Sequence, residues 1–162
     1  MKDVIVFDIS TDGIELLKNR IVGITTKSAT EERILTYRDE KKILEEFWHY
    51  VNSFQKIAGF NSSNFDVPML IIRSIKHKIQ IPNLKDKLVD LRNIIFGGYE
   101  RKGKLEDIQQ LLEISFFDSR YKKMHMSLLW EANNIPKLKE FLLRDVKITW
   151  QLYEHIEGAG LI

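Results

Sequence analysis

Apolar residues in the first part of the chain predict three strands. The segment DVIVFDIS (residues 3–10) is a short apolar run with β-branched residues, which is typical of a buried strand. The following TDG (residues 11–13) is a turn signal. RIVGITTK (residues 20–27) and ERILTY (residues 32–37) indicate two more strands, with SAT in the hairpin connection between them.

Apolar residues then recur at helical spacing. DEKKILEEFWHYVNSF (residues 39–54) opens on an acidic first turn and predicts a helix. KIAGF (residues 56–60) predicts another buried strand. Residues 61–78 begin with helix-capping residues, carry Pro68 in the first turn and continue as a helix. The apolar stripe expected on the first helix consists of Ile43, Leu44, Phe47, Trp48, Val51 and Phe54.

The remaining pattern predicts a short strand at residues 87–91 and helices at 104–114, 126–134 and about 136–158. Three strands are thus followed by a series of helix, strand and helix. This order predicts an α/β fold: an antiparallel meander extended by a parallel strand, with helices covering the mixed sheet. The length of 162 residues suits one domain, residues 1–162, with a sizeable core.

Amino-acid composition excludes some classes of protein but does not indicate one function. The absence of cysteine excludes a disulfide framework and thiolate metal sites. With no signal peptide and no apolar run of spanning length, we expect a cytoplasmic protein. A net charge of +2 neither requires nor excludes a nucleic-acid partner. Basic clusters at residues 73–78, 99–104 and 119–125 are either ordinary solvated surface or contacts around a site.

Three aspartates occupy positions that the pattern would give to other residues. Asp8 ends the first buried strand, Asp66 lies where a strand gives way to a helix, and Asp145 interrupts the apolar face of the last helix. If these segments pack together, the three like charges require a compensating cation. Carboxylate oxygens without His or Cys ligands select Mg²⁺ or Mn²⁺.

Each aspartate also has an ordinary structural explanation. Asp8 would open the turn that follows it, and Asp66 would be a favourable charge at a helix N-terminus. Asp145 would pair with a basic neighbour or face water. A purely structural explanation of all three, however, requires three separate coincidences.

Three segments resemble the motifs of DEDD-superfamily 3′-to-5′ exonucleases. FDIST (residues 7–11) resembles the first motif, FDIET, and GFNSSNFDVPML (residues 59–70) resembles the second, in which an Asn and a Phe-Asp pair follow a strand. LLRDVKITWQLY (residues 142–153) resembles the third. DLRNII and GKLEDIQQLLEI between them are similar to the family's Asp-Leu strand end and Leu-rich helix. The similarity spans nearly the whole chain and is greatest to the proofreading exonuclease domain of family-B DNA polymerases and its stand-alone relatives.

The resemblance implies an RNase H-like fold and a metal-dependent hydrolase. Asp8, Asp66 and Asp145 would hold two Mg²⁺ or Mn²⁺ ions roughly 4 Å apart, or a single ion. Water would attack the 3′-terminal phosphodiester and release nucleotides one at a time. The expected partners are nucleic acid, with single-stranded DNA 3′ ends favoured, and replication or repair proteins.

Two motif positions depart from the family. Ser10 replaces the Glu that helps bind the metal holding the attacking water. Phe141 and Glu140 occupy the positions of the Tyr or His that orients this water. Asp12 and Glu15 are near enough in sequence to be considered as replacements for the missing Glu. These departures leave a second hypothesis open, a degenerate exonuclease fold that binds nucleic acid or a repair partner without cutting; an endonuclease is a third.

Several residues are candidates for nucleic-acid contact. Lys104 with Arg101 and Lys102 would touch the backbone, and Tyr121 beside Lys122 would stack on a base. Three further residues each have two explanations. Phe65 either stacks on a base or belongs to the core, and Asn61 and Asn64 either bond the terminal nucleotide or cap the helix.

Overall fold

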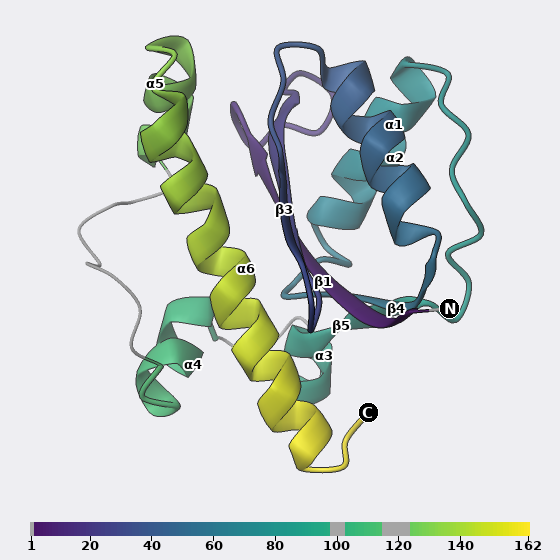
Figure 1. The fold of residues 1–162 in the computed structure, drawn as a ribbon, viewed down its shortest axis with the longest axis vertical. Helices are drawn as coiled ribbons and strands as arrows, with labels where there is room; N and C mark the ends of the chain where they lie inside the picture. The colour runs from purple at the N-terminus through teal and green to yellow at the C-terminus, as the bar shows by residue number, and fades with distance from the viewer. Residues whose placement is uncertain (1, 98–102, 115–123) are drawn as a thin grey trace.

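A computed structural model describes residues 2–97, 103–114 and 124–162 of the chain. Its five-stranded sheet has the order β3-β2-β1-β4-β5 (Figure 1). β1 (Lys2–Thr11), β2 (Ile21–Lys27) and β3 (Glu32–Leu35) form an antiparallel meander. β4 (Phe54–Gly59) pairs in parallel with β1, and β5 (Leu88–Asp90) pairs in parallel with β4. The predicted mixed α/β sheet is therefore confirmed.

Helices cover both faces of this sheet (Figure 1). α1 (Glu40–Val51) and α2 (Asp66–Lys76) lie on one face, and the long α6 (Ile135–Gly158) crosses the other. α3 (Leu91–Phe96), α4 (Leu105–Leu111) and α5 (Met124–Glu131) complete the helices of the described ranges. Among these helices, none is both long and apolar enough to span a bilayer.

The alternation of β1 distributes its side chains between two cores. Ile5, Phe7 and Ile9 pack in the larger cluster with the apolar residues of α1 and α2. Val6 points the other way and packs in the cluster built by α3, α4 and α6. Because side chains alternate along a strand, Asp8 follows Val6 on the side covered by α6. The pattern of the first strand thus decides which face receives the acidic side chain.

Differences from the expected elements are local. Phe54 opens β4 rather than closing the first helix, which ends at Val51. Its ring still packs on Tyr50, 5.2 Å between centroids, so an apolar residue at this position continues the helical spacing. α3 was not predicted, because its six residues are too few to show a helical period. The predicted capping of α2 is wrong: Phe65 is its N-cap and makes no side-chain capping bond.

The basic cluster at residues 73–78 is partly buried rather than wholly solvated. Arg73 is 3% exposed and donates from Nε and Nη2 to Glu40 at 2.8 and 2.5 Å. Glu40 also lies 2.7 Å from His77 Nε2 and accepts the Ile21 N–H at 2.7 Å. Burial raises the pKa of Glu40, but hydrogen bonds from these three partners outweigh burial and leave it below its ordinary value. This cluster joins α1, α2 and the start of β2.

Candidate active site

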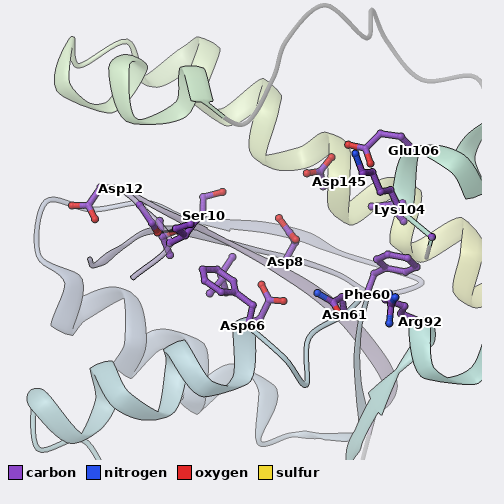
Figure 2. Close-up of a pocket in the computed structure, with 17 residues that line it drawn as sticks. Asp8, Ser10, Asp12, Phe60, Asn61, Asp66, Arg92, Lys104, Glu106 and Asp145 are labelled. Atoms are coloured by element: carbon purple, nitrogen blue, oxygen red, sulfur yellow. Dashed lines mark hydrogen bonds between the residues drawn. The ribbon is translucent and has the colours of Figure 1, made fainter. Parts of the chain in front are cut away.

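One cavity of about 730 Å³ lies where β1 ends, beside the start of α2 and the middle of α6. Asp8, Asp66 and Asp145 all line it, and Figure 2 shows their carboxylates directed into the space between their three elements. They are separated by 58 and 79 positions in sequence, counted as 66 − 8 and 145 − 66. The fold therefore brings together the three aspartates that the sequence pattern singled out.

Thr25 of β2 links the part of β1 that carries Asp8 to the part of α6 that carries Asp145. The antiparallel register pairs Asp8 with Thr25. The buried Thr25 hydroxyl donates to the carbonyl of Leu142 at 3.0 Å, one turn before Asp145 on α6. Gly23 permits this close approach, because a Cβ there would lie 2.9 Å from Leu142 Cδ1. These contacts of β2 with Leu142 therefore fix the position of α6 along the direction of β1.

Asp66 is the first residue of α2 and is 8% exposed. The turn that precedes it satisfies the first helical amides through the main chain. Val67 N–H donates to the Ser62 carbonyl and Met69 N–H to the Phe65 carbonyl, both at 2.9 Å. A carboxylate at this position is favoured by the partial positive charge of the helix N-terminus.

Asp145 has a basic neighbour on its own helix, Arg144. Arg144 Nε lies 3.9 Å from Asp145 Oδ1, beyond hydrogen-bond distance. The Asp145 side chain is 21% exposed, and its main-chain carbonyl accepts the Thr149 hydroxyl at 2.8 Å. The carboxylate is therefore held in place by the helix while remaining accessible from the cavity.

The cavity is lined by basic as well as acidic side chains. Figure 2 shows Arg92, Phe60 and Lys104 toward one end of the view, and Ser10 with Asp12 toward the other. Arg92 is 7% exposed, and its guanidinium carbon lies 5.6 Å from the centroid of the Phe96 ring. A buried cation and an aromatic ring beside a group of carboxylates suit an anionic ligand that carries flat groups.

The three aspartates are suitable ligands for hard divalent ions such as Mg²⁺ and Mn²⁺, because such ions prefer oxygen ligands and each aspartate provides carboxylate oxygens. Within residues 2–97, 103–114 and 124–162, no three acidic or histidine side chains stand close enough to hold one ion in their present conformations. Coordination of one ion by all three aspartates would therefore require their carboxylates to move closer together.

The possible replacements for the missing motif Glu are engaged elsewhere. Ser10 is 2% exposed and lines the cavity. Asp12 also lines it, but its carboxylate accepts Arg20 N–H at 2.8 Å and Arg20 Nε–H at 3.1 Å. Glu15 pairs with Lys18 at 2.6 Å on the exposed surface. Neither acid is favoured as a substitute ligand.

The position of the water-orienting residue is apolar. Phe141 packs in a small cluster with Val22, Trp130 and Leu138 and is absent from the cavity lining. Glu140 is exposed. Among the described residues that line the cavity, none is a Tyr or His.

The candidate nucleic-acid contacts divide into three groups. Asn61, Phe65 and Lys104 line the cavity. Asn64 is exposed and donates from Nδ2 to Asn61 Oδ1 at 2.9 Å, so the two side chains support the turn rather than capping α2. The last group lies outside the described residues: Arg101, Lys102, Tyr121 and Lys122.

Among the charged and aromatic lining residues, the sequence reasoning missed three, namely Phe60, Arg92 and Glu106. Phe60 and Arg92 follow the carboxyl ends of the parallel strands β4 and β5, where ligands collect in α/β sheets, so a signal for them existed. Glu106 lies on the exposed first turn of α4, where Glu is ordinary. Only packing reveals its place.

An antiparallel meander extended by parallel strands, with helices on both faces, defines an RNase H-like fold. The chain matches a family B DNA polymerase from the hyperthermophilic archaeon Pyrobaculum calidifontis with a TM-score of 0.81 and 21% identity. The match covers 94% of this chain and 24% of the polymerase, so the chain spans about a quarter of that protein's length. The likeness establishes the fold.

Family membership comes from the sequence itself. Residues 16–136 match the family described as "Predicted 3'-5' exonuclease related to the exonuclease domain of PolB", and the chain belongs to this family. A relative in Methanocaldococcus jannaschii, the uncharacterized protein MJ0365, is 34% identical over 171 residues, covering 97% of both chains. The matched family segment contains Asp66, whereas Asp8 and Asp145 lie outside it.

Proposed function

We propose that this protein is a divalent-metal-dependent 3′-to-5′ exonuclease that acts on single-stranded DNA ends. The proposal is supported by one observation above all, that Asp8, Asp66 and Asp145 come from three separated segments and line one cavity. Family membership supports the reaction class. Metal use, strand preference and activity itself belong to the proposal.

The three aspartates would hold Mg²⁺ or Mn²⁺, which supplies an activated water and stabilises the leaving 3′ oxygen. The protein's own part is positioning. β1, α2 and α6 are regular elements, and they would set the backbone position from which each carboxylate reaches the metal. Arg92 and Lys104 would attract the phosphates, while Phe60 and Phe65 offer faces for the terminal bases.

The rival function is nucleic-acid binding without cutting. Ser10 and Phe141 favour it, because a serine hydroxyl is a poor replacement for a carboxylate and a phenyl ring cannot orient water. The three aspartates favour the enzyme, because a binding module gains nothing from gathering like charges in one cavity.

The Asp145→Ala variant distinguishes the two functions. A 5′-labelled single strand incubated with Mn²⁺ should be shortened from its 3′ end by the wild-type protein. The variant should be slower by about 10³-fold, because it loses several kcal/mol of metal-borne stabilisation. Glu154→Ala, an exposed acid on the same helix, should cut normally. If the wild type leaves the strand intact yet binds it in a salt-sensitive manner, the rival function holds.

Ser10→Glu should raise the rate. The new carboxylate would enter the cavity from β1 beside Asp8 and restore the missing ligand, a gain of about 10- to 100-fold at limiting Mn²⁺. The Mn²⁺ concentration that gives half the maximal rate should also fall. Ser10→Ala serves as the neutral control and should change neither quantity by more than about threefold. A Ser10→Glu protein that folds but gains nothing would show that Ser10 is not a lost ligand.

A further inference from the structure

Asp90 accepts three hydrogen bonds from the main chain. It is the last residue of β5 and the N-cap of α3, and it is 8% exposed. Its Oδ1 accepts the N–H groups of Asn61 and Arg92, each at 3.0 Å. Its Oδ2 accepts the N–H of Ser63 at 2.9 Å. One carboxylate therefore joins the turn after β4 to the first turn of α3.

The turn that Asp90 holds has a tightly defined backbone. Asn61 has φ +58°, in the left-handed region, which Asn adopts more readily than most other non-glycine residues. The turn also lies tightly over the end of β4, since a Cβ on Gly59 would stand 2.7 Å from Ser62 Cβ. Loss of the carboxylate would leave two part-buried N–H donors without their acceptor, at a cost of about 1–3 kcal/mol each.

The same turn leads directly into the cavity. Asn61 lines the cavity, and Asp66 follows on the first turn of α2. Ser62 accepts the Val67 N–H, so the start of α2 moves with the turn. On the other side of Asp90, Arg92 lines the same cavity. Asp90 does not line the cavity, but it fixes two walls of the cavity relative to each other.

We infer that Asp90 is a positioning residue, whose carboxylate sets the place of Asp66, and of Arg92, in the cavity. This inference rests on the proposed function in one respect, the role of Asp66 as a metal ligand. Only a carboxylate of this length satisfies all three donors. Asn would turn an NH₂ group toward an N–H, and Glu would place its oxygens one methylene too far along.

The test compares Asp90→Asn with Asp39→Asn. Asp39 is the matched control, because it is the N-cap of α1 as Asp90 is of α3. Its carboxylate accepts the N–H of Lys41, two residues later, at 2.9 Å, and Asp39 does not line the cavity. The measurements are Mn²⁺ affinity by titration calorimetry, and amide hydrogen exchange at Asn61 and Ser63 by NMR. Asp90→Asn should weaken Mn²⁺ binding by about tenfold or more and speed exchange at Ser63, whose acceptor Oδ2 is replaced by an NH₂ group. Asp39→Asn should change neither.

The outcomes separate this inference from the proposed function. If the wild type binds Mn²⁺ and Asp90→Asn binds it as tightly as Asp39→Asn does, the positioning role is overturned while the proposed function stands. Unchanged exchange at Ser63 in Asp90→Asn overturns the role as well. If the wild type binds no Mn²⁺, the proposed function fails, and the role toward the metal fails with it. Selective loss of affinity in Asp90→Asn supports both.

Discussion

Asp8→Asn is expected to lower the rate of 3′-nucleotide release by about 10³-fold or more while leaving the fold intact. Asn has the shape of Asp but lacks the charge, so the variant removes the attraction for a divalent ion and little else. A loss of several kcal/mol of transition-state stabilisation corresponds to this fall in rate. The measurement is single-turnover cleavage of a 5′-labelled strand with Mn²⁺, alongside circular dichroism to verify the fold.

Asp12→Asn provides the matched control for Asp8. Asp12 lines the same cavity, but its carboxylate is bound to Arg20. Its replacement should change the rate by less than about threefold and cost at most about 1 kcal/mol of stability, the usual range for a partly exposed pair. Equal losses in both variants would mean that the general negative charge of the cavity matters, and not the ligand role of Asp8.

Glu40→Gln is expected to reduce the free energy of unfolding by about 3–5 kcal/mol. The amide of Gln keeps the shape of Glu but leaves the buried Arg73 guanidinium without a compensating charge. Removal of one partner of a buried ion pair is strongly destabilising, because the other charge stays buried and unpaired. Chemical denaturation at pH 7 measures the change. Glu45→Gln is the control: its pair with Lys41 is exposed, at 3.6 Å, and its loss should cost no more than about 0.5 kcal/mol.

The effect of Glu40 should depend on pH with a defined sign. The native pKa of Glu40 is lowered, so the unfolded chain takes up the proton more readily than the folded one. The stabilising contribution is complete above the ordinary value of about 4.5 and is lost as pH falls through the lower native pKa. The difference in stability between wild type and Glu40→Gln should therefore shrink on acidification below pH 4.5. A difference that grew instead would contradict the assignment.

Much of the fold could be predicted because most elements are long enough to show their period. The alternation of β1 and the apolar face of α6 each reflect burial against neighbouring elements, and both are visible in the sequence. The failures have the same origin. α3 has six residues, and Phe54 packs on Tyr50 although the helix has already ended. Short elements and element ends carry too little periodic signal.

The candidate site was predictable to the extent that its residues break a pattern. Asp145 interrupts an apolar face, and Asp66 lies at a change from strand to helix, so each was noticeable by itself. Glu106 breaks no pattern, because an acid on the first turn of a helix is common. Its entry into the cavity depends on how α4 packs, which the local sequence does not encode.

By itself, the sequence determined the order of strands and helices, the covering of the sheet by helices and the three acids at positions that favour other residues. It could do so because local periodicity records which side of an element is buried. The tertiary structure decided the partner of each charge. Arg20 takes Asp12, Arg73 takes Glu40, and the amides of a distant turn take Asp90. The second and third of these choices join residues 33 and 29 positions apart in the chain, and only the packing of whole elements sets the distances between them.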